Sequence, residues 1–62
     1  SDVYKRQVYY YLGDSYFRWK KNDQAVPYLT KLVSDYPKSP FAKKAQERLK
    51  EISQAVPAKG KS

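Results

Sequence analysis

The sequence predicts an all-α fold: an antiparallel helix pair that forms one repeat unit, followed by a third, capping helix. Apolar residues recur at three- and four-residue spacing in three successive segments, which is the period of helices that bury one face. A short polar run separates the first segment from the second, and prolines separate the second from the third. With 62 residues, the chain has room for one small domain with a modest core.

The first helix is expected over about residues 8–20. Gly13 lies within its apolar face, although a glycine inside a helix costs about 1 kcal/mol relative to alanine. That cost indicates that Gly13 lies where another helix crosses closely. Tyr11 and Trp19 fall outside the apolar face, so we expect these large side chains to be exposed. The residues that share the apolar face are Tyr9, Leu12, Gly13 and Tyr16.

The second helix is expected over about residues 24–35. Asp23 is its predicted N-cap, because an aspartate side chain can accept a hydrogen bond from a free backbone N–H of the first turn. Pro27 then falls in the first turn, where a missing N–H costs little. Pro37 ends this helix. The apolar stripe consists of Ala25, Val26, Leu29, Leu32, Val33 and Tyr36.

The third helix is expected over about residues 40–53. Ser39 is its predicted N-cap and Pro40 its first residue, a position that proline favours. A polar outer face is typical of a helix that caps a stack of helices. The apolar face contains Phe41, Ala42, Ala45, Leu49 and Ile52, and the opposite face contains Lys43, Lys44, Glu47, Arg48, Lys50 and Glu51. The small, basic segment at residues 55–62, with Pro57 and Gly60, predicts a disordered tail.

The spacing of key residues across the first two helices resembles the tetratricopeptide repeat pattern, W-x2-L-G-x2-Y, then A-x3-F, then P. The matching residues are Tyr9, Leu12, Gly13, Tyr16, Ala25, Leu29 and Pro37. Tyrosine replaces the first Trp, leucine replaces the Phe, and the turn between the helices lacks its common glycine. The resemblance implies an α-solenoid fragment with a non-catalytic role in protein–protein interaction. The third helix would then begin a following repeat or cap the array.

Within that class, the stretch DYPKSPFAKKAQERL at residues 35–49 is similar to repeats of bacterial envelope proteins. It resembles the C-terminal repeat of the BamD family of outer-membrane assembly lipoproteins, and almost as closely the repeats of the CpoB (YbgF) family of Tol-Pal coordinators. The resemblance implies a scaffold in the bacterial periplasm, lipid-anchored to the outer membrane in the BamD-like case. The partners it implies are outer-membrane barrel-assembly or Tol-Pal proteins, together with neighbouring repeats.

The first seven residues, SDVYKRQ, resemble no part of that pattern. Back-translated as TCA-GAT-GTG-TAT-AAG-AGA-CAG, they reproduce the transposon adapter used in preparing sequencing libraries. We therefore expect residues 1–7 to be a translated adapter scar in front of a three-helix module at residues 8–54, and the natural protein to continue upstream with further repeats. Lys5, Arg6 and Gln7 are good helix formers, so the scar can extend the first helix backwards.

The resemblance also implies a set of partner-binding residues. In helical projection, Tyr10, Asp14, Phe17 and Arg18 form a second stripe on the first helix. In tetratricopeptide arrays this stripe lines the concave groove, so Tyr10 and Phe17 are the expected apolar anchors and Asp14 and Arg18 the expected polar contacts. The alternative is that the stripe touches a neighbouring repeat or only water. For the exposed aromatic residues of the first helix, we expect a missing upstream repeat to cover them, with a true ligand site as the alternative.

The amino-acid composition argues against an enzyme. The chain has no cysteine and no histidine, so it cannot by itself build the usual zinc sites, Ser-His triads or Cys-His nucleophile pairs. Asp14, Asp23 and Asp35 lie in helix or cap contexts without a second catalytic group beside them. We therefore expect no catalytic, cofactor-binding or metal-binding residues. No apolar run approaches the ~20 residues that a transmembrane helix needs.

The net charge of +7 leaves one further alternative open, a basic nucleic-acid-binding helical module. The lysine pairs at 20–21 and 43–44 lie near tyrosines, and proteins that bind single strands combine basic and stacking side chains. The charge is spread thinly, however, and no nucleic-acid-binding motif accompanies it. We therefore expect protein partners and no nucleic acid.

Overall fold

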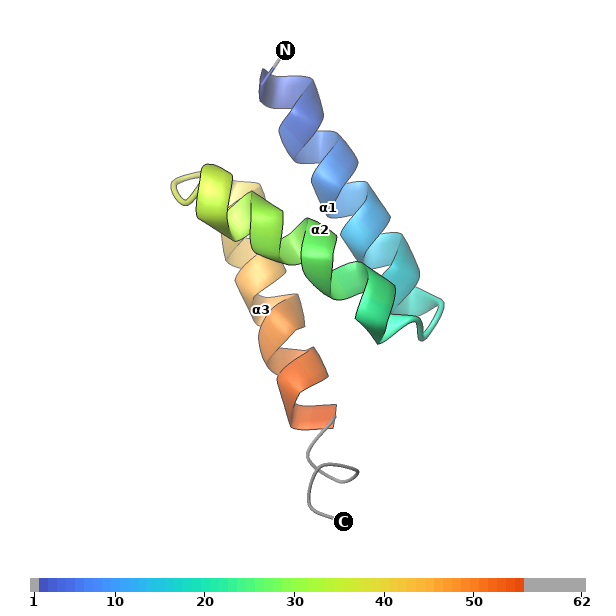
Figure 1. The fold of residues 1–62 in the computed structure, drawn as a ribbon. Coiled ribbons are helices and arrows are strands. Elements are labelled where there is room, and N and C mark those ends of the chain that lie inside the picture. Colours follow the sequence, from blue (N-terminus) through green and yellow to red (C-terminus); the bar gives the residue numbers. More distant parts are fainter. Residues whose placement is uncertain (1, 56–62) are drawn as a thin grey trace.

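The computed structural model describes residues 2–55, which form three helices joined by two short turns (Figure 1). The helices are α1 (Asp2–Arg18), α2 (Asn22–Asp35) and α3 (Pro40–Ala55). No strand occurs within residues 2–55, and the predicted all-α fold is confirmed. The tail expected over residues 55–62 lies outside the described residues, except for Ala55, the last residue of α3.

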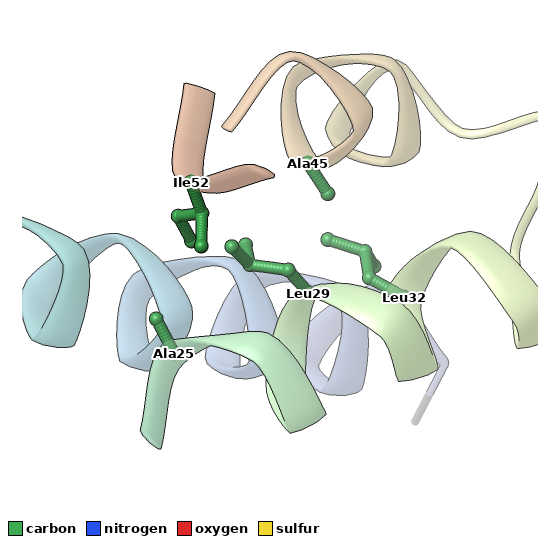
Figure 2. Close-up of a cluster of buried hydrophobic side chains, with 5 residues drawn as sticks. All are labelled: Ala25, Leu29, Leu32, Ala45 and Ile52. Atoms are coloured by element: carbon green, nitrogen blue, oxygen red, sulfur yellow. The ribbon is translucent and has the colours of Figure 1, made fainter. Parts of the chain in front are cut away.

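The middle helix forms the centre of the structure, and all three helices contact one another. In Figure 1, α2 crosses in front of α3, and its beginning lies beside the end of α1. Figure 2 shows the buried cluster, in which the α2 side chains Leu29 and Leu32 point toward Ala45 and Ile52 of α3. Ala25, also on α2, completes the cluster. The half-buried rings of α1 pack around it; they belong to Tyr9, Tyr10, Tyr16 and Phe17.

The closest approach of α1 to α2 is at Gly13. A Cβ atom placed on Gly13 would lie 2.6 Å from Cδ2 and 2.7 Å from Cγ of Leu29, which is fully buried. Carbon atoms pack at about 3.5–4.0 Å, so any side chain at this position would collide with Leu29. Gly13 therefore lies at a helix crossing, as its cost in a helix indicates.

α1 extends over a different range from the one expected. It begins at Asp2 and not near residue 8, because residues 2–7 are helical as well. It ends at Arg18 because Lys20 adopts a left-handed backbone conformation, with φ 65°. The Lys21 N–H donates to the Tyr16 carbonyl at 2.8 Å, and the Lys20 N–H donates to the Phe17 carbonyl at 3.0 Å. These two bonds form the Schellman motif, which usually has glycine where this chain has lysine.

The predicted start of α2, at about residue 24, is two residues too late. α2 begins at Asn22, and Lys21 precedes it with no side-chain cap hydrogen bond. The Lys21 carbonyl already accepts the N–H groups of Gln24 and Ala25, at 3.0 and 3.1 Å, so Asp23 lies inside the first turn and is no N-cap. Asp23 still lies in the first turn, where a negative charge interacts favourably with the positive end of the helix dipole. Pro27 consequently lies in the second turn, where its missing N–H leaves one carbonyl of the helix without a donor.

The turn between α2 and α3 is held by backbone and side-chain hydrogen bonds. Tyr36 ends α2 and donates its N–H to the Leu32 carbonyl at 2.9 Å. Pro37 follows and cannot continue the helix. The buried side chain of Ser39 accepts the Phe41 N–H at 3.1 Å, in the manner of an N-cap at the start of α3. α3 then runs to Ala55, slightly beyond the expected end at residue 53.

We predict that Lys20→Gly stabilises the protein. A non-glycine residue in the left-handed region carries a steric cost of about 1–2 kcal/mol, which glycine avoids at the expense of a more flexible unfolded chain. The expected net gain is about 0.5–1 kcal/mol in the free energy of unfolding, measured by urea denaturation. Lys21→Gly is the matched control, because Lys21 has φ −106° and gains nothing from glycine. A Lys20→Gly variant no more stable than Lys21→Gly would contradict a steric cost at Lys20.

Candidate protein-binding surface

The second stripe of α1 faces α3. The Tyr10 ring lies 5.4 Å from the ring of Phe41, measured between centroids, at the start of α3. Near the end of α1, the Arg48 guanidinium lies 5.1 Å from the centroid of the Phe17 ring, within the range of a cation–π contact. Both rings also pack against the buried cluster. The two predicted apolar anchors of the groove therefore join α1 to α3.

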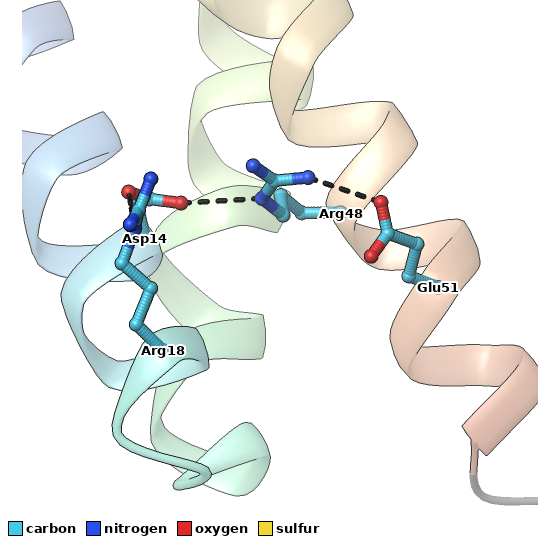
Figure 3. Close-up of polar contacts among 4 residues, drawn as sticks. All are labelled: Asp14, Arg18, Arg48 and Glu51. Carbon is cyan, nitrogen blue, oxygen red and sulfur yellow. Dashed lines mark hydrogen bonds and ion pairs between the residues drawn. The ribbon is translucent and has the colours of Figure 1, made fainter.

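Asp14 is the polar centre of the same contact (Figure 3). One carboxylate oxygen accepts the Arg18 Nε–H at 2.7 Å, and the other accepts the Arg48 Nε–H at 3.2 Å. Arg48 also donates to Glu51 at 3.0 Å, so four charged side chains form one network across α1 and α3. The Asp14 side chain is only 13% exposed, whereas that of Arg18 is 72% exposed. The inner member of the network is thus shielded and its outer member is accessible.

The surroundings of Asp14 change its ionisation. Partial burial alone would raise the pKa of its carboxyl group, but the hydrogen bonds from Arg18 and Arg48 act against burial, and the net pKa is lowered. The hydrogen bond to Asp14 raises the pKa of Arg48, with burial opposing it. Asp14 therefore stays ionised at neutral pH and holds both guanidinium groups.

Of the four predicted groove residues, three contact α3 and one is largely exposed. Tyr10, Asp14 and Phe17 contact α3, which corresponds to the alternative in which this stripe touches a neighbouring helix of the array. Arg18 is largely free to reach a partner. A ligand-facing role for the four residues stays a prediction.

Arg48 was assigned to the solvated face of the third helix, and that assignment is wrong. Its side chain is 27% exposed and reaches Asp14 on α1. The signal was present in the sequence, because Arg48 follows Ala45 by three residues and precedes Ile52 by four, the spacing of one helix face. Arg48 was placed on the solvated face because charged side chains are usually exposed.

The opposite side of α1 is exposed and apolar. We call this side the open face and define it by Val8, Tyr11 and Trp19, whose exposed fractions are 50%, 59% and 67%. Leu12 lies beside them in helical projection and is half-buried. The predicted exposure of Tyr11 and Trp19 is confirmed. Tyr4 is exposed too, but it belongs to the segment that we interpret as an adapter scar, so it is left out of the definition.

A column of aromatic rings ends the open face. The Trp19 and Tyr16 rings are stacked with centroids 6.4 Å apart, and the Tyr16 and Tyr28 rings are stacked at 5.9 Å. The Lys21 ammonium lies 4.8 Å from the centroid of the Trp19 ring. These contacts fix the position of Trp19 while leaving most of its surface accessible. The open face therefore ends at a tryptophan that is held by ring contacts and is still largely accessible.

A shallow cleft lies where the start of α1 approaches the α2–α3 turn. Arg6, Tyr36 and the turn residues 37–40 line it, and the Arg6 guanidinium lies 5.3 Å from the centroid of the Tyr36 ring. Because Arg6 belongs to the segment interpreted as a scar, we assign the cleft no function. Within residues 2–55 no cluster of acidic side chains could hold a metal ion, and no helix is both long and apolar enough to cross a membrane.

Comparison with known protein families identifies the repeat. A family model described as the tetratricopeptide repeat matches residues 7–39, more than half of the chain. The chain belongs to the tetratricopeptide repeat family. No curated protein and no solved structure matches the chain significantly.

Membership in the tetratricopeptide repeat family accounts for the arrangement of α1 and α2. The matched range ends just before α3, which lies beyond the repeat as an additional helix. Tetratricopeptide repeats are typically non-catalytic scaffold modules, and the repeat indicates a role in protein–protein interaction. The match does not distinguish the BamD family from the CpoB family.

The Asp14 network predicts a pH-dependent stability. Because the pKa of Asp14 is lower in the folded state, its stabilisation is present above about pH 4, near the ordinary carboxyl value, and is lost as the pH falls through the folded pKa. Asp14→Asn should lower the free energy of unfolding by about 1 kcal/mol at pH 7. The difference from the unmutated chain should shrink as the pH falls below 4 in urea titrations.

The matched control is Asp35→Asn. Asp35 pairs with Lys31 at 3.2 Å within α2, and the two side chains are 43% and 53% exposed, so removing this pair should change stability little. Equal losses in the two variants, or a difference for Asp14→Asn that does not depend on pH, would contradict the assigned role of Asp14.

Proposed function

We propose that the chain is the terminal protein-binding part of a BamD-like outer-membrane protein assembly lipoprotein in the bacterial periplasm. The observation that carries this proposal is the α2–α3 turn and the helix after it. The turn has the Tyr-Pro-x-Ser stop of the resembled repeats, and Ser39 caps α3 within it. The Ala-spaced residues that follow, Ala42 and Ala45, are buried against the rest of the module.

The polar side of α3 supports a terminal position. Its exposed residues include Lys43, Lys44, Glu47, Lys50 and Glu51. A helix that carries this many charges on its outer side does not need a further helix to cover it, as expected for a terminal capping helix. The accessible apolar surface lies on α1, at the other side of the module. Partners and upstream repeats would therefore engage the α1 side.

The second candidate is a CpoB-like periplasmic protein of the Tol-Pal system. The same Tyr-Pro-x-Ser stop and Ala-spaced helix favour it, because they resemble the repeats of that family almost as closely. Both candidates share a scaffold role without catalysis, and they differ in the partners bound.

Binding to purified envelope proteins tests the proposal. The 62-residue chain, immobilised, is exposed in turn to purified outer-membrane barrel-assembly components and to purified Tol-Pal components. We expect saturable binding to the barrel-assembly components, and its loss in Gly13→Leu, which disrupts the helix crossing. Lys50→Gln, on the polar side of α3, is the control that should bind like the unmutated chain. Saturable binding to Tol-Pal components alone would favour the second candidate, and binding to neither would contradict the proposal.

A further inference from the structure

The open face of α1 has the form of a helix-binding surface. Val8, Tyr11 and Leu12 recur at helical spacing, and Trp19 extends the surface past the end of α1 to a length of about three turns. Apolar residues at three- and four-residue spacing form ridges that pack into the grooves of another helix. Exposed fractions of half or more for Val8, Tyr11 and Trp19 mean that the described residues leave at least half of each residue's surface accessible.

The charges beside the open face are almost all of one sign. Arg18, Lys20 and Lys21 flank Trp19 in the sequence and are exposed, and the Lys21 ammonium lies over the Trp19 ring. Asp14 is nearby but shielded, and both its oxygens are bonded to arginine. The one exposed carboxylate adjacent to this group in the described chain is Asp23, at the start of α2. The Trp19 end of the open face is therefore apolar and basic at once.

We propose that the open face binds an acidic amphipathic helix of a partner protein, which is the ligand-site alternative to coverage by an upstream repeat. The apolar stripe of that helix would lie on Val8, Tyr11 and Leu12, and carboxylates near one end of it would lie against Arg18, Lys20 and Lys21. Opposite charges at the edge of an apolar contact select the partner and its orientation. The inference rests on the proposed function as a protein-interaction module and names the chemistry of the partner.

Charge disfavours a second copy of this chain as the occupant. In a parallel pair of α1 helices, the two basic groups around Trp19 would meet. In an antiparallel pair, each basic group would approach the exposed Lys5 of the other copy. Both arrangements bring like charges together, which costs binding free energy.

A designed peptide pair tests the inference. The probe is a peptide of about 15 residues, roughly four helical turns, with leucines at helical spacing, glutamates at one end and no tryptophan. The matched peptide carries lysines in place of the glutamates. The chain has a single tryptophan, so Trp19 fluorescence reports binding at this surface directly, with titration calorimetry as the second readout. We expect the acidic peptide to bind at least about tenfold more tightly than the basic one, a difference of about 1.4 kcal/mol.

Three variants locate the binding. Tyr11→Ser removes an apolar contact and Lys21→Glu reverses a charge, and each should weaken binding of the acidic peptide by about fivefold or more. Lys50→Glu makes the same charge reversal on the polar side of α3 and should change binding by less than about twofold. Both Tyr11 and Lys21 are exposed, so circular dichroism should show unchanged helicity in these variants.

The outcomes separate this inference from the proposed function. Equal affinity for the two peptides, no Trp19 response to the acidic peptide, concentration-dependent dimers of the chain, or binding only to anionic vesicles or duplex DNA would each overturn the inference. If the chain binds barrel-assembly components and Tyr11→Ser leaves that binding unchanged, the inference fails while the proposed function stands. If the acidic peptide binds as expected but no envelope component does, the proposed function fails while the inference stands.

Discussion

The contact between Gly13 and Leu29 is the constraint on which the rest of the structure depends. Leu29 fills the space that a side chain at residue 13 would occupy, so α1 and α2 approach closely enough for the rings of α1 to cover the buried cluster. Leu29 itself lies in the buried cluster with Ile52, so the position of α2 also sets that of α3. In a module this small, where few side chains are fully buried, one close crossing accounts for much of the packing.

That crossing divides the surface of α1 into two sides with different chemistry. One side turns toward α3 and is closed by aromatic contacts and by the Asp14 network. The other side remains uncovered and combines Tyr11 and Trp19 with basic residues. Because α3 is polar on its outer side, the α3 side of the module needs no further helix to cover it, whereas the α1 side exposes apolar residues. An interaction module that contacts its partner through α1 follows from this asymmetry.

Sequence spacing was sufficient to predict the features that depend on local chemistry or on a fixed interval between residues. Gly13, the Ser39 cap and the exposure of Trp19 belong to this group, and the structure places each as its spacing indicates. The start of α2 was misplaced because the left-handed conformation of Lys20 cannot be read from a lysine, a residue that rarely adopts it. Arg48 was misassigned because a charged residue is normally solvated, and only its tertiary pairing with Asp14 explains its burial.

The stability of Gly13→Leu relative to Ser15→Leu tests the central role of the crossing most directly. Both changes place the same side chain on α1, one against the buried Leu29 and the other at an exposed position. Overpacking at the crossing should lower the free energy of unfolding by about 1–3 kcal/mol for Gly13→Leu, while Ser15→Leu should stay within about 0.5 kcal/mol of the unmutated chain. An unchanged urea midpoint for Gly13→Leu would show that α1 and α2 do not pair through this contact, and the account of both surfaces would fail with it.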